Sequence, residues 1–251
     1  MSSNREYIFF WVPKSAGSSI YQALSEHGCR KIILHAGLGV TDKTRGVATS
    51  HIDINYLLDV NIIDKAFYQR AFKFGVVRNP WDRLVSLYFY TEFDKKMNFD
   101  SFARLVHRKL QLRKHPFYRS VFNGGSGGIF RLFYKAVLRI NPAFTRMMPV
   151  PLPGPYNVKE LSQCGPQSDW LIDDSGQLLV DFLARFENLA ELEERLVHEL
   201  DIALSLPHVN ATRRRQYQHY YTPELVALVA EAYAEDIARF DYVFEENAIE
   251  Q

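Results

Sequence analysis

The sequence predicts an α/β fold built around a mainly parallel β-sheet. Two short runs, Tyr7–Val12 and Phe72–Val77, are rich in β-branched and aromatic residues and almost wholly apolar, which is typical of strands buried on both faces. Each run is followed by a stretch with helical spacing of apolar residues. Strands that alternate with helices predict βαβ units and therefore parallel strand pairing.

The elements of the N-terminal part follow in chain order. After Pro13 ends the first strand, the helix Gly17–His27 places Ile20, Ala23 and Leu24 on one face. Two short strands and two short helices are then predicted: Lys31–His35, Gly46–Ser50, Ile54–Leu58 and Ile62–Tyr68. Asn79-Pro80 opens the helix after the second long strand, because proline tolerates the first helical position, where its missing N–H costs nothing.

The C-terminal part mixes helices, strands and long connections. A helix is predicted over Phe99–Leu112, a glycine-rich loop over 123–128 and an extended proline-rich segment over 149–155. Strands are predicted at Trp170–Ile172 and Leu179–Phe186, on either side of a turn at 173–176. The last helices are Leu189–Leu200 and Thr222–Phe240, the second capped by Thr222.

Charge is distributed in blocks that the net charge of +1 hides. Residues 1–100 carry +3, residues 101–158 carry +10 with no acidic residue, and residues 159–251 carry −12. The basic block predicts either a surface that faces an anion, such as a nucleotide or an acidic acceptor, or internal pairing with the acidic C-terminal part. No DNA-reading pattern accompanies it, so we expect no nucleic-acid partner.

Cysteine content and hydropathy bear on the compartment. The two cysteines, Cys29 and Cys164, are too few for a disulfide framework or a cysteine-rich zinc site. The N-terminal residues have no basic leader, and the run Tyr7–Val12 is too short to cross a membrane. We therefore expect a cytoplasmic protein without a transmembrane segment.

The turn after the first strand has the composition of an anion site. It reads Pro13-Lys14-Ser15-Ala16-Gly17-Ser18-Ser19, so small residues lead into a helix N-terminus, whose free N–H groups and dipole favour negative charge. Lys14 precedes the small residues, whereas the lysine of a Walker A loop follows its glycines. The alternative is an ordinary βα loop with a surface lysine.

The second long strand leads into Arg78 of the run Arg78-Asn-Pro-Trp-Asp-Arg-Leu-Val-Ser-Leu-Tyr88. A P-loop kinase often has at a comparable place an aspartate that holds Mg²⁺. An arginine at the carboxyl end of a parallel strand suits a phosphate instead. The sequence thus predicts two anion sites at one edge of the sheet and no metal site.

Both runs resemble the nucleotide-binding loops of the PAPS-dependent sulfotransferases, 13–19 their 5′-phosphosulfate loop and 78–88 their 3′-phosphate motif. Residues 164–170, 185–189 and 206–210 resemble the carbohydrate branch (sulfotransferase family 2), which includes the heparan 2-O and chondroitin enzymes. The resemblance covers residues 6–244. It implies a P-loop-like central parallel sheet flanked by helices, in a single sulfotransferase domain over 1–251. Within it, 1–100 is the PAPS-binding core, 101–158 a basic acceptor or lid region, and 159–251 an acidic part that completes the fold.

The resemblance also implies roles for individual residues. PAPS is the co-substrate, and no metal is needed. Lys14 binds the 5′-phosphosulfate and stabilises the bridging oxygen as its bond to sulfur breaks. The 5′-phosphate is expected to lie against the backbone of Ser15, Ala16, Gly17, Ser18 and Ser19. The 3′-phosphate is expected to contact the side chains of Arg78 and Ser86. Asp82 and Arg83 are assigned to structure, as an ion pair.

The acceptor hydroxyl must lose a proton, and histidine is the usual base near neutral pH. Among eight histidines, His51 follows a predicted strand, and Thr49–Tyr56 resembles the stretch with the catalytic histidine in the 2-O-sulfotransferases. The alternatives are a structural role for His51, and His35, Glu92 or Asp94 as the base.

Two basic regions and two other functions stay open from the sequence. Arg213–Arg215 either cover the 3′-phosphate or begin a solvated helix, and the residues around the 123–128 loop either form an acceptor cleft or pair internally. The acceptor implied by the resemblance is a hydroxyl-bearing glycan or glycoconjugate, either neutral or anionic. The competing functions are a P-loop nucleotide kinase and a non-catalytic module that binds a nucleotide or a sulfated glycan.

Overall fold

The computed structural model describes residues 5–32, 44–115, 161–206 and 215–245. The chain groups into two compact units, the first made of 1–79 with 167–214 and the second of 80–166 with 215–251. The single domain over 1–251 therefore stays a prediction.

The first unit contains a parallel sheet of five strands in the order β2-β3-β1-β4-β5. The strands are β1 (Tyr7–Phe10), β2 (Cys29–Lys31), β3 (Gly46–Ala48), β4 (Phe72–Val77) and β5 (Phe182–Arg185). In the register, Phe9 lies opposite Ala48 of β3 and Phe74 of β4, and Val77 lies opposite Arg185. The prediction of an α/β fold with a central parallel sheet is confirmed.

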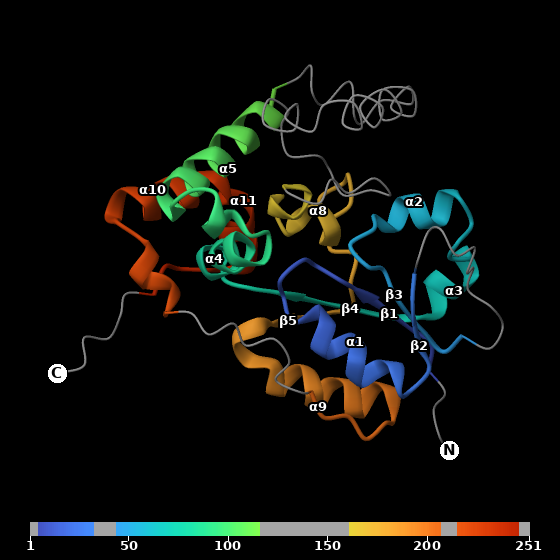
Figure 1. Ribbon diagram of the computed structural model, residues 1–251. Coiled ribbons are helices and arrows are strands. Elements are labelled where there is room, and N and C mark those ends of the chain that lie inside the picture. The colour runs from blue at the N-terminus through green and yellow to red at the C-terminus, as the bar shows by residue number, and fades with distance from the viewer. Residues whose placement is uncertain (1–4, 33–43, 116–160, 207–214, 246–251) are drawn as a thin grey trace. The chain divides into compact units, whose positions relative to one another are not determined.

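Helices cover both faces of this sheet (Figure 1). One face carries α1 (Gly17–Ser25) and α9 (Leu189–Leu200), and the other carries α2 (Ile54–Asp59), α3 (Lys65–Arg70) and the short α8 (Ser168–Leu171). Alternate residues of the central strands form the core under α1 and α9, including Tyr7, Phe9 and Phe74. All four residues of β1 are buried, as its apolar sequence predicts.

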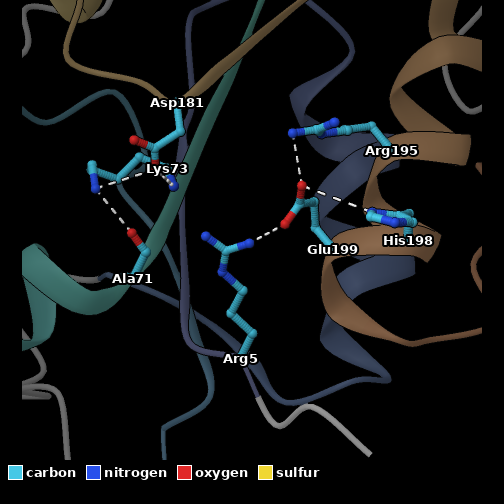
Figure 2. Close-up of polar contacts among 7 residues, drawn as sticks. All are labelled: Arg5, Ala71, Lys73, Asp181, Arg195, His198 and Glu199. Carbon is cyan, nitrogen blue, oxygen red and sulfur yellow. Dashed lines mark hydrogen bonds and ion pairs between the residues drawn. The ribbon is translucent and has the colours of Figure 1, made fainter.

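Ion pairs join the amino ends of the strands to neighbouring elements (Figure 2). Arg5, just before β1, pairs with Glu199 of α9, and Arg195 approaches the same carboxylate at 2.7 Å. Lys73 of β4 pairs with Asp181, just before β5, at 3.2 Å, and its ammonium donates to the carbonyl of Ala71 at 2.9 Å. These contacts lie at the amino-terminal edge of the sheet. The predicted anion sites lie at the opposite, carboxyl-terminal edge.

Several predicted boundaries change in the structure. The strand predicted at Trp170–Ile172 is wrong, because Trp170 belongs to α8 and only an isolated bridge joins Ile172 to Leu178. The helix predicted at Ile62–Tyr68 is α3, which begins later than predicted, at Lys65, because Asp64 caps it by accepting from the Phe67 N–H at 3.2 Å. The strand predicted at Lys31–His35 ends at Lys31 as β2, and residues 33–35 lie outside the described part of the chain.

The second unit is helical in its described residues. It contains α4 (Pro80–Tyr90), α5 (Phe99–Arg113), α10 (Pro223–Ala232) and α11 (Ala234–Phe240). The predicted helix Thr222–Phe240 breaks at Tyr233, whose backbone leaves helical geometry while its hydroxyl donates to the Cys164 carbonyl at 2.7 Å. Buried Arg83 donates to the carbonyls of Gln163 and Gly165, which supports its assignment to structure.

The described start of the basic block pairs with the acidic C-terminal part. On α5, Arg104 lies 2.8 Å from Asp100 and 2.9 Å from Glu224 of α10. His107, also on α5, lies 3.1 Å from Glu231 of α10. These contacts favour internal pairing for residues 101–115. The remainder of the block, including the 123–128 loop, lies outside the described residues.

Two other sequence expectations concern the cysteines and membrane-spanning segments. Cys29 and Cys164 are both buried free thiols, and burial raises the pKa of each to about 12, which makes them unreactive at neutral pH. Among the helices of the described ranges, none is both long and apolar enough to cross a membrane.

Lys109 on α5 gives a testable pH dependence of stability. The residue is buried, and burial, with a contribution from Arg108, lowers the pKa of its ammonium to about 8. Between pH 8 and the unfolded pKa of about 10.4, the unfolded chain binds more protons, so native stability rises with pH in this window. The quantity to compare is the unfolding free energy of Lys109→Met minus that of wild type. We expect this difference to be ~1–3 kcal/mol larger at pH 7 than at pH 10.

Denaturant unfolding of both proteins between pH 7 and pH 10 measures this difference. Lys114→Met is the matched control, since Lys114 is exposed near the end of the same helix and its removal should give a pH-independent difference. A Lys109→Met difference that stays constant across the window would contradict the lowered pKa.

Candidate active site

Three sequence-predicted groups follow three neighbouring parallel strands. The loop with Lys14 follows β1, His51 follows β3, and Arg78 follows β4, with β1 between the other two. Carboxyl ends of parallel strands meet at one edge of a sheet, where ligands bind in open α/β folds. The structure therefore brings Lys14, His51 and Arg78 to one edge of the first unit.

The first loop has two residues in the left-handed region, Lys14 at φ 66° and Ala16 at φ 61°. Ala16 is the N-cap of α1 and has no capping side chain, and its carbonyl accepts the first helical bond from Ile20 at 3.1 Å. The first-turn N–H groups of α1 therefore need partners from outside the helix. Lys14 is half-buried at this end, Ser15 and Ser19 are buried, and Ser18 is exposed. This geometry suits an anion.

Gly17 is required by close packing rather than by its backbone angle. A Cβ added to Gly17 would overlap the indole of Trp11, the first residue after β1. The indole is stacked between neighbours on the same side of the sheet, with Phe9 at 5.9 Å and Tyr21 at 5.7 Å between ring centroids. The start of α1 can approach the loop only because this position has no side chain.

Arg78 connects the two predicted anion sites. Its side chain is almost buried, and its Nη1 donates to the carbonyl of Lys14 at 3.0 Å. Its guanidinium carbon lies 3.9 Å from the centroid of the Phe186 ring, a cation–π geometry. The loop after β4 and the loop after β1 are therefore in direct contact.

Two residues that the sequence did not single out fix the backbone around Arg78. The amide of Gln167 bonds both main-chain groups of Arg78, accepting from its N–H and donating to its carbonyl at 2.9 Å each. Glu187 accepts from the Asn79 N–H at 2.7 Å. Both lie in segments quoted for the family resemblance, 164–170 and 185–189, but no spacing rule relates those segments to Arg78.

His51 is held with a defined tautomer. Ser50 and His51 both adopt left-handed backbone angles, with φ of 55° and 68°. The Nδ1 atom of His51 lies 2.7 Å from the carbonyl oxygen of Trp11. A carbonyl oxygen can only accept, so Nδ1 carries the hydrogen and the neutral ring has its lone pair on Nε2. Half-buried His51 thus has the tautomer of a base that acts through Nε2.

Lys31 adds a cation that the sequence did not single out. It is the last residue of β2, and its ammonium lies 4.8 Å from the centroid of the Trp11 ring. No motif marks it, because a lysine at the end of a short strand is common on protein surfaces. This edge of the sheet therefore carries a second lysine in addition to Lys14.

The other predicted site residues belong to the second unit or lie outside the described part of the chain, so their relation to this edge stays a prediction. Ser86 is buried on α4 of the second unit, so its pairing with Arg78 stays a prediction. Glu92, in the same unit, is 2.8 Å from Lys95, and this contact lowers the pKa of its carboxyl, which makes it a weak base at neutral pH. Asp94 is exposed in that unit, whereas His35 and residues 213–214 lie outside the described ranges.

The model of a family described as "Sulfotransferase family" matches residues 1–243 of the chain. No curated protein and no solved structure matches the chain. The matched range includes the Lys14 loop, His51, Arg78 and the segments with Gln167 and Glu187.

Proposed function

Because this chain belongs to the sulfotransferase family, we propose that it transfers the sulfuryl group of PAPS to a hydroxyl group of a carbohydrate acceptor without a metal ion. The observation that carries the proposal is the hydrogen bond from the Arg78 guanidinium to the Lys14 carbonyl. This bond joins the Lys14 loop to the start of the 78–88 run, the two segments that we expect to bind anions. A donor with a 5′-phosphosulfate and a 3′-phosphate needs two such elements.

The donor set fits this nucleotide chemically. The first turn of α1 offers N–H donors, and Lys14 adds a positive charge for the 5′-phosphosulfate. Arg78, with Ser86 as its expected partner, supplies the charge for the 3′-phosphate. PAPS contributes a sulfuryl group on a phosphate leaving group.

Lys14 and His51 divide the chemistry of transfer. The Nε2 atom of His51 accepts the proton of the acceptor hydroxyl as that oxygen forms its bond to sulfur. Lys14 balances the negative charge that the phosphate oxygen gains as its bond to sulfur breaks. The products are a sulfate ester and 3′,5′-adenosine bisphosphate. The carbohydrate acceptor is inferred from the resemblance of 164–170, 185–189 and 206–210 to the carbohydrate branch.

The kinase and binding-module alternatives make different predictions. A P-loop kinase needs Mg²⁺ and an acidic residue to hold it, whereas β4 leads into Arg78. Transfer that continues in EDTA supports the sulfotransferase. ATP-dependent phosphorylation that EDTA abolishes supports the kinase, and nucleotide binding without transfer to any glycan supports the binding module.

Thermal unfolding tests the 3′-phosphate site directly. We expect 3′,5′-adenosine bisphosphate to raise the melting temperature and AMP to raise it much less, because AMP lacks the 3′-phosphate. A ligand at 100 times its Kd stabilises the native state by about 2.7 kcal/mol. Arg78→Ala should remove most of the bisphosphate shift.

Arg70→Ala is the matched control, since exposed Arg70 pairs with Glu6 on the surface of the same unit. It should keep the full bisphosphate shift. An equal shift from ATP with Mg²⁺ would show that the 3′-phosphate is not recognised, and the sulfotransferase proposal would fail at Arg78.

A further inference from the structure

A buried segment, Gln167–Leu171, touches both the arginine and the histidine of the candidate site. It consists of the N-cap residue Gln167 and the helix α8. Gln167, Ser168, Trp170 and Leu171 are all buried, although none of them follows a sheet strand directly. Its contacts therefore require an explanation other than the order of the strands.

At its N-terminal end, the segment fixes Arg78. The side-chain amide of Gln167 makes two 2.9 Å bonds to the main chain of Arg78 and has no exposed surface. A primary amide can accept one hydrogen bond and donate another. The Gln167 amide therefore pairs with the N–H and carbonyl of Arg78 as a residue on a neighbouring strand would. These two bonds hold the main chain of Arg78 at the end of β4, from which its side chain reaches the carbonyl of Lys14.

At its C-terminal end, the segment fixes His51. The indole N–H of Trp170 donates to the His51 carbonyl oxygen at 3.1 Å. His51 and Ser50 are in left-handed backbone angles, which a non-glycine residue keeps only where its surroundings enforce them. The Trp170 bond holds the backbone of His51, and the Nδ1 contact to Trp11 holds its ring.

The segment is itself anchored to the sheet. A Cβ on Gly75 of β4 would lie 2.8 Å from Leu171 Cδ2, so the missing side chain at Gly75 lets α8 approach the strand. Leu179 donates from its N–H to the Leu171 carbonyl at 2.8 Å, just before the chain enters β5. Both contacts anchor Leu171, the last residue of the segment, to the sheet and to the chain before β5.

We propose that Gln167–Leu171 is a positioning element that serves both halves of the reaction, in which Gln167 orients Arg78 for the nucleotide and Trp170 orients His51 for proton transfer. Neither is a catalytic residue, because each acts through another side chain. The roles of Arg78 and His51 rest on the proposed function, whereas the contacts of the segment do not.

Two conservative variants separate the two ends. Gln167→Met keeps the length of the side chain and removes both bonds to Arg78. We expect it to weaken binding of 3′,5′-adenosine bisphosphate roughly tenfold in calorimetry. The reason is that a misoriented Arg78 loses binding free energy equal to about one net hydrogen bond to the ligand. Trp170→Phe keeps a ring and removes the donor to His51, and should leave bisphosphate affinity within about twofold of wild type.

The state of His51 is read by two-bond ¹H–¹⁵N spectra of ¹⁵N-histidine-labelled protein. In wild type and Gln167→Met we expect the Nδ1-protonated tautomer. In Trp170→Phe we expect a shift toward the mixture of an unconstrained imidazole. In transfer assays, Trp170→Phe should lower kcat, and Gln167→Met should mainly raise the KM for PAPS.

The controls match each change in kind. Gln177→Met alters an exposed glutamine of the same unit and should change neither readout. Trp81→Phe removes an indole bond to a carbonyl, that of Val226 at 3.1 Å, from the second unit. It should destabilise the protein like Trp170→Phe but leave the His51 tautomer as in wild type.

The outcomes distinguish this proposal from the proposed function. If wild type binds the bisphosphate and neither variant changes its own readout, the positioning role is overturned and the function stands. If wild type does not bind it, the function fails, and two ligand-free signals decide on the positioning role. These are the His51 tautomer and the guanidinium N–H resonances of Arg78, which the Phe186 ring current shifts and Gln167→Met should move.

Discussion

His51→Gln is expected to slow sulfuryl transfer by about 10²–10⁴-fold, the usual contribution of a general base. Glutamine cannot take up the acceptor proton, although its amide can still approach the Trp11 carbonyl that His51 contacts at 2.7 Å. The bisphosphate shift in melting temperature should survive, because His51 is not among the groups expected to bind the phosphates. The loss should therefore appear in kcat rather than in the KM for PAPS.

The measurement is transfer of the sulfuryl group to the glycan acceptor that a screen with wild type provides, at several pH values. His198→Gln is the control, since His198 is 80% exposed on α9. It should keep wild-type kcat. A His51→Gln enzyme with wild-type kcat would remove His51 as the base and return the question to the other candidates.

Gly17→Ala is expected to destabilise the protein, against the general trend for helices. Replacing glycine by alanine inside a helix usually stabilises by up to about 1 kcal/mol. Here the added methyl group would overlap the indole of Trp11, which is stacked against Phe9 and Tyr21. Overpacking of this kind costs ~1–3 kcal/mol or more. The displaced start of α1 should also weaken bisphosphate binding.

Denaturant unfolding of Gly17→Ala and of Ser18→Ala measures the effect. Ser18 is the next residue of the same helix and is exposed, so its substitution adds no buried atom. In a Trp11→Leu background, Gly17→Ala should cost less stability than it does in wild type, because leucine leaves free the space of the indole. A stabilised Gly17→Ala protein would show that Trp11 does not pack against α1.

The sequence alone predicted the elements whose pattern is local. The apolar runs of β1 and β4 could be recognised because strands buried on both faces have little choice of residue type, and α9 because its apolar residues recur at helical spacing. Lys14 and Arg78 could be expected at one edge of the sheet because they lie in the loops that follow those two strands. The carboxyl edge of a parallel sheet then decides where they lie.

Where long-range contacts compete with local preference, the sequence misled. Trp170 sits in a run of β-forming residues, yet it is helical, where its indole N–H reaches the carbonyl of His51. The helix predicted through Tyr233 breaks there, and the Tyr233 hydroxyl bonds the distant carbonyl of Cys164. Such bonds join residues far apart in the chain, and no periodicity in the sequence records them.

The sequence thus determined that Lys14, His51 and Arg78 were expected at one edge of the sheet, and the tertiary structure decided how they are held and added Lys31. Gln167 and Phe186 fix Arg78 from segments about 90 and 110 positions further along the chain. The tautomer of His51 depends on the carbonyl of Trp11, 40 residues before it. Local propensity acts over a few residues, whereas these orientations arise only when parallel strands bring distant segments to one edge of the sheet.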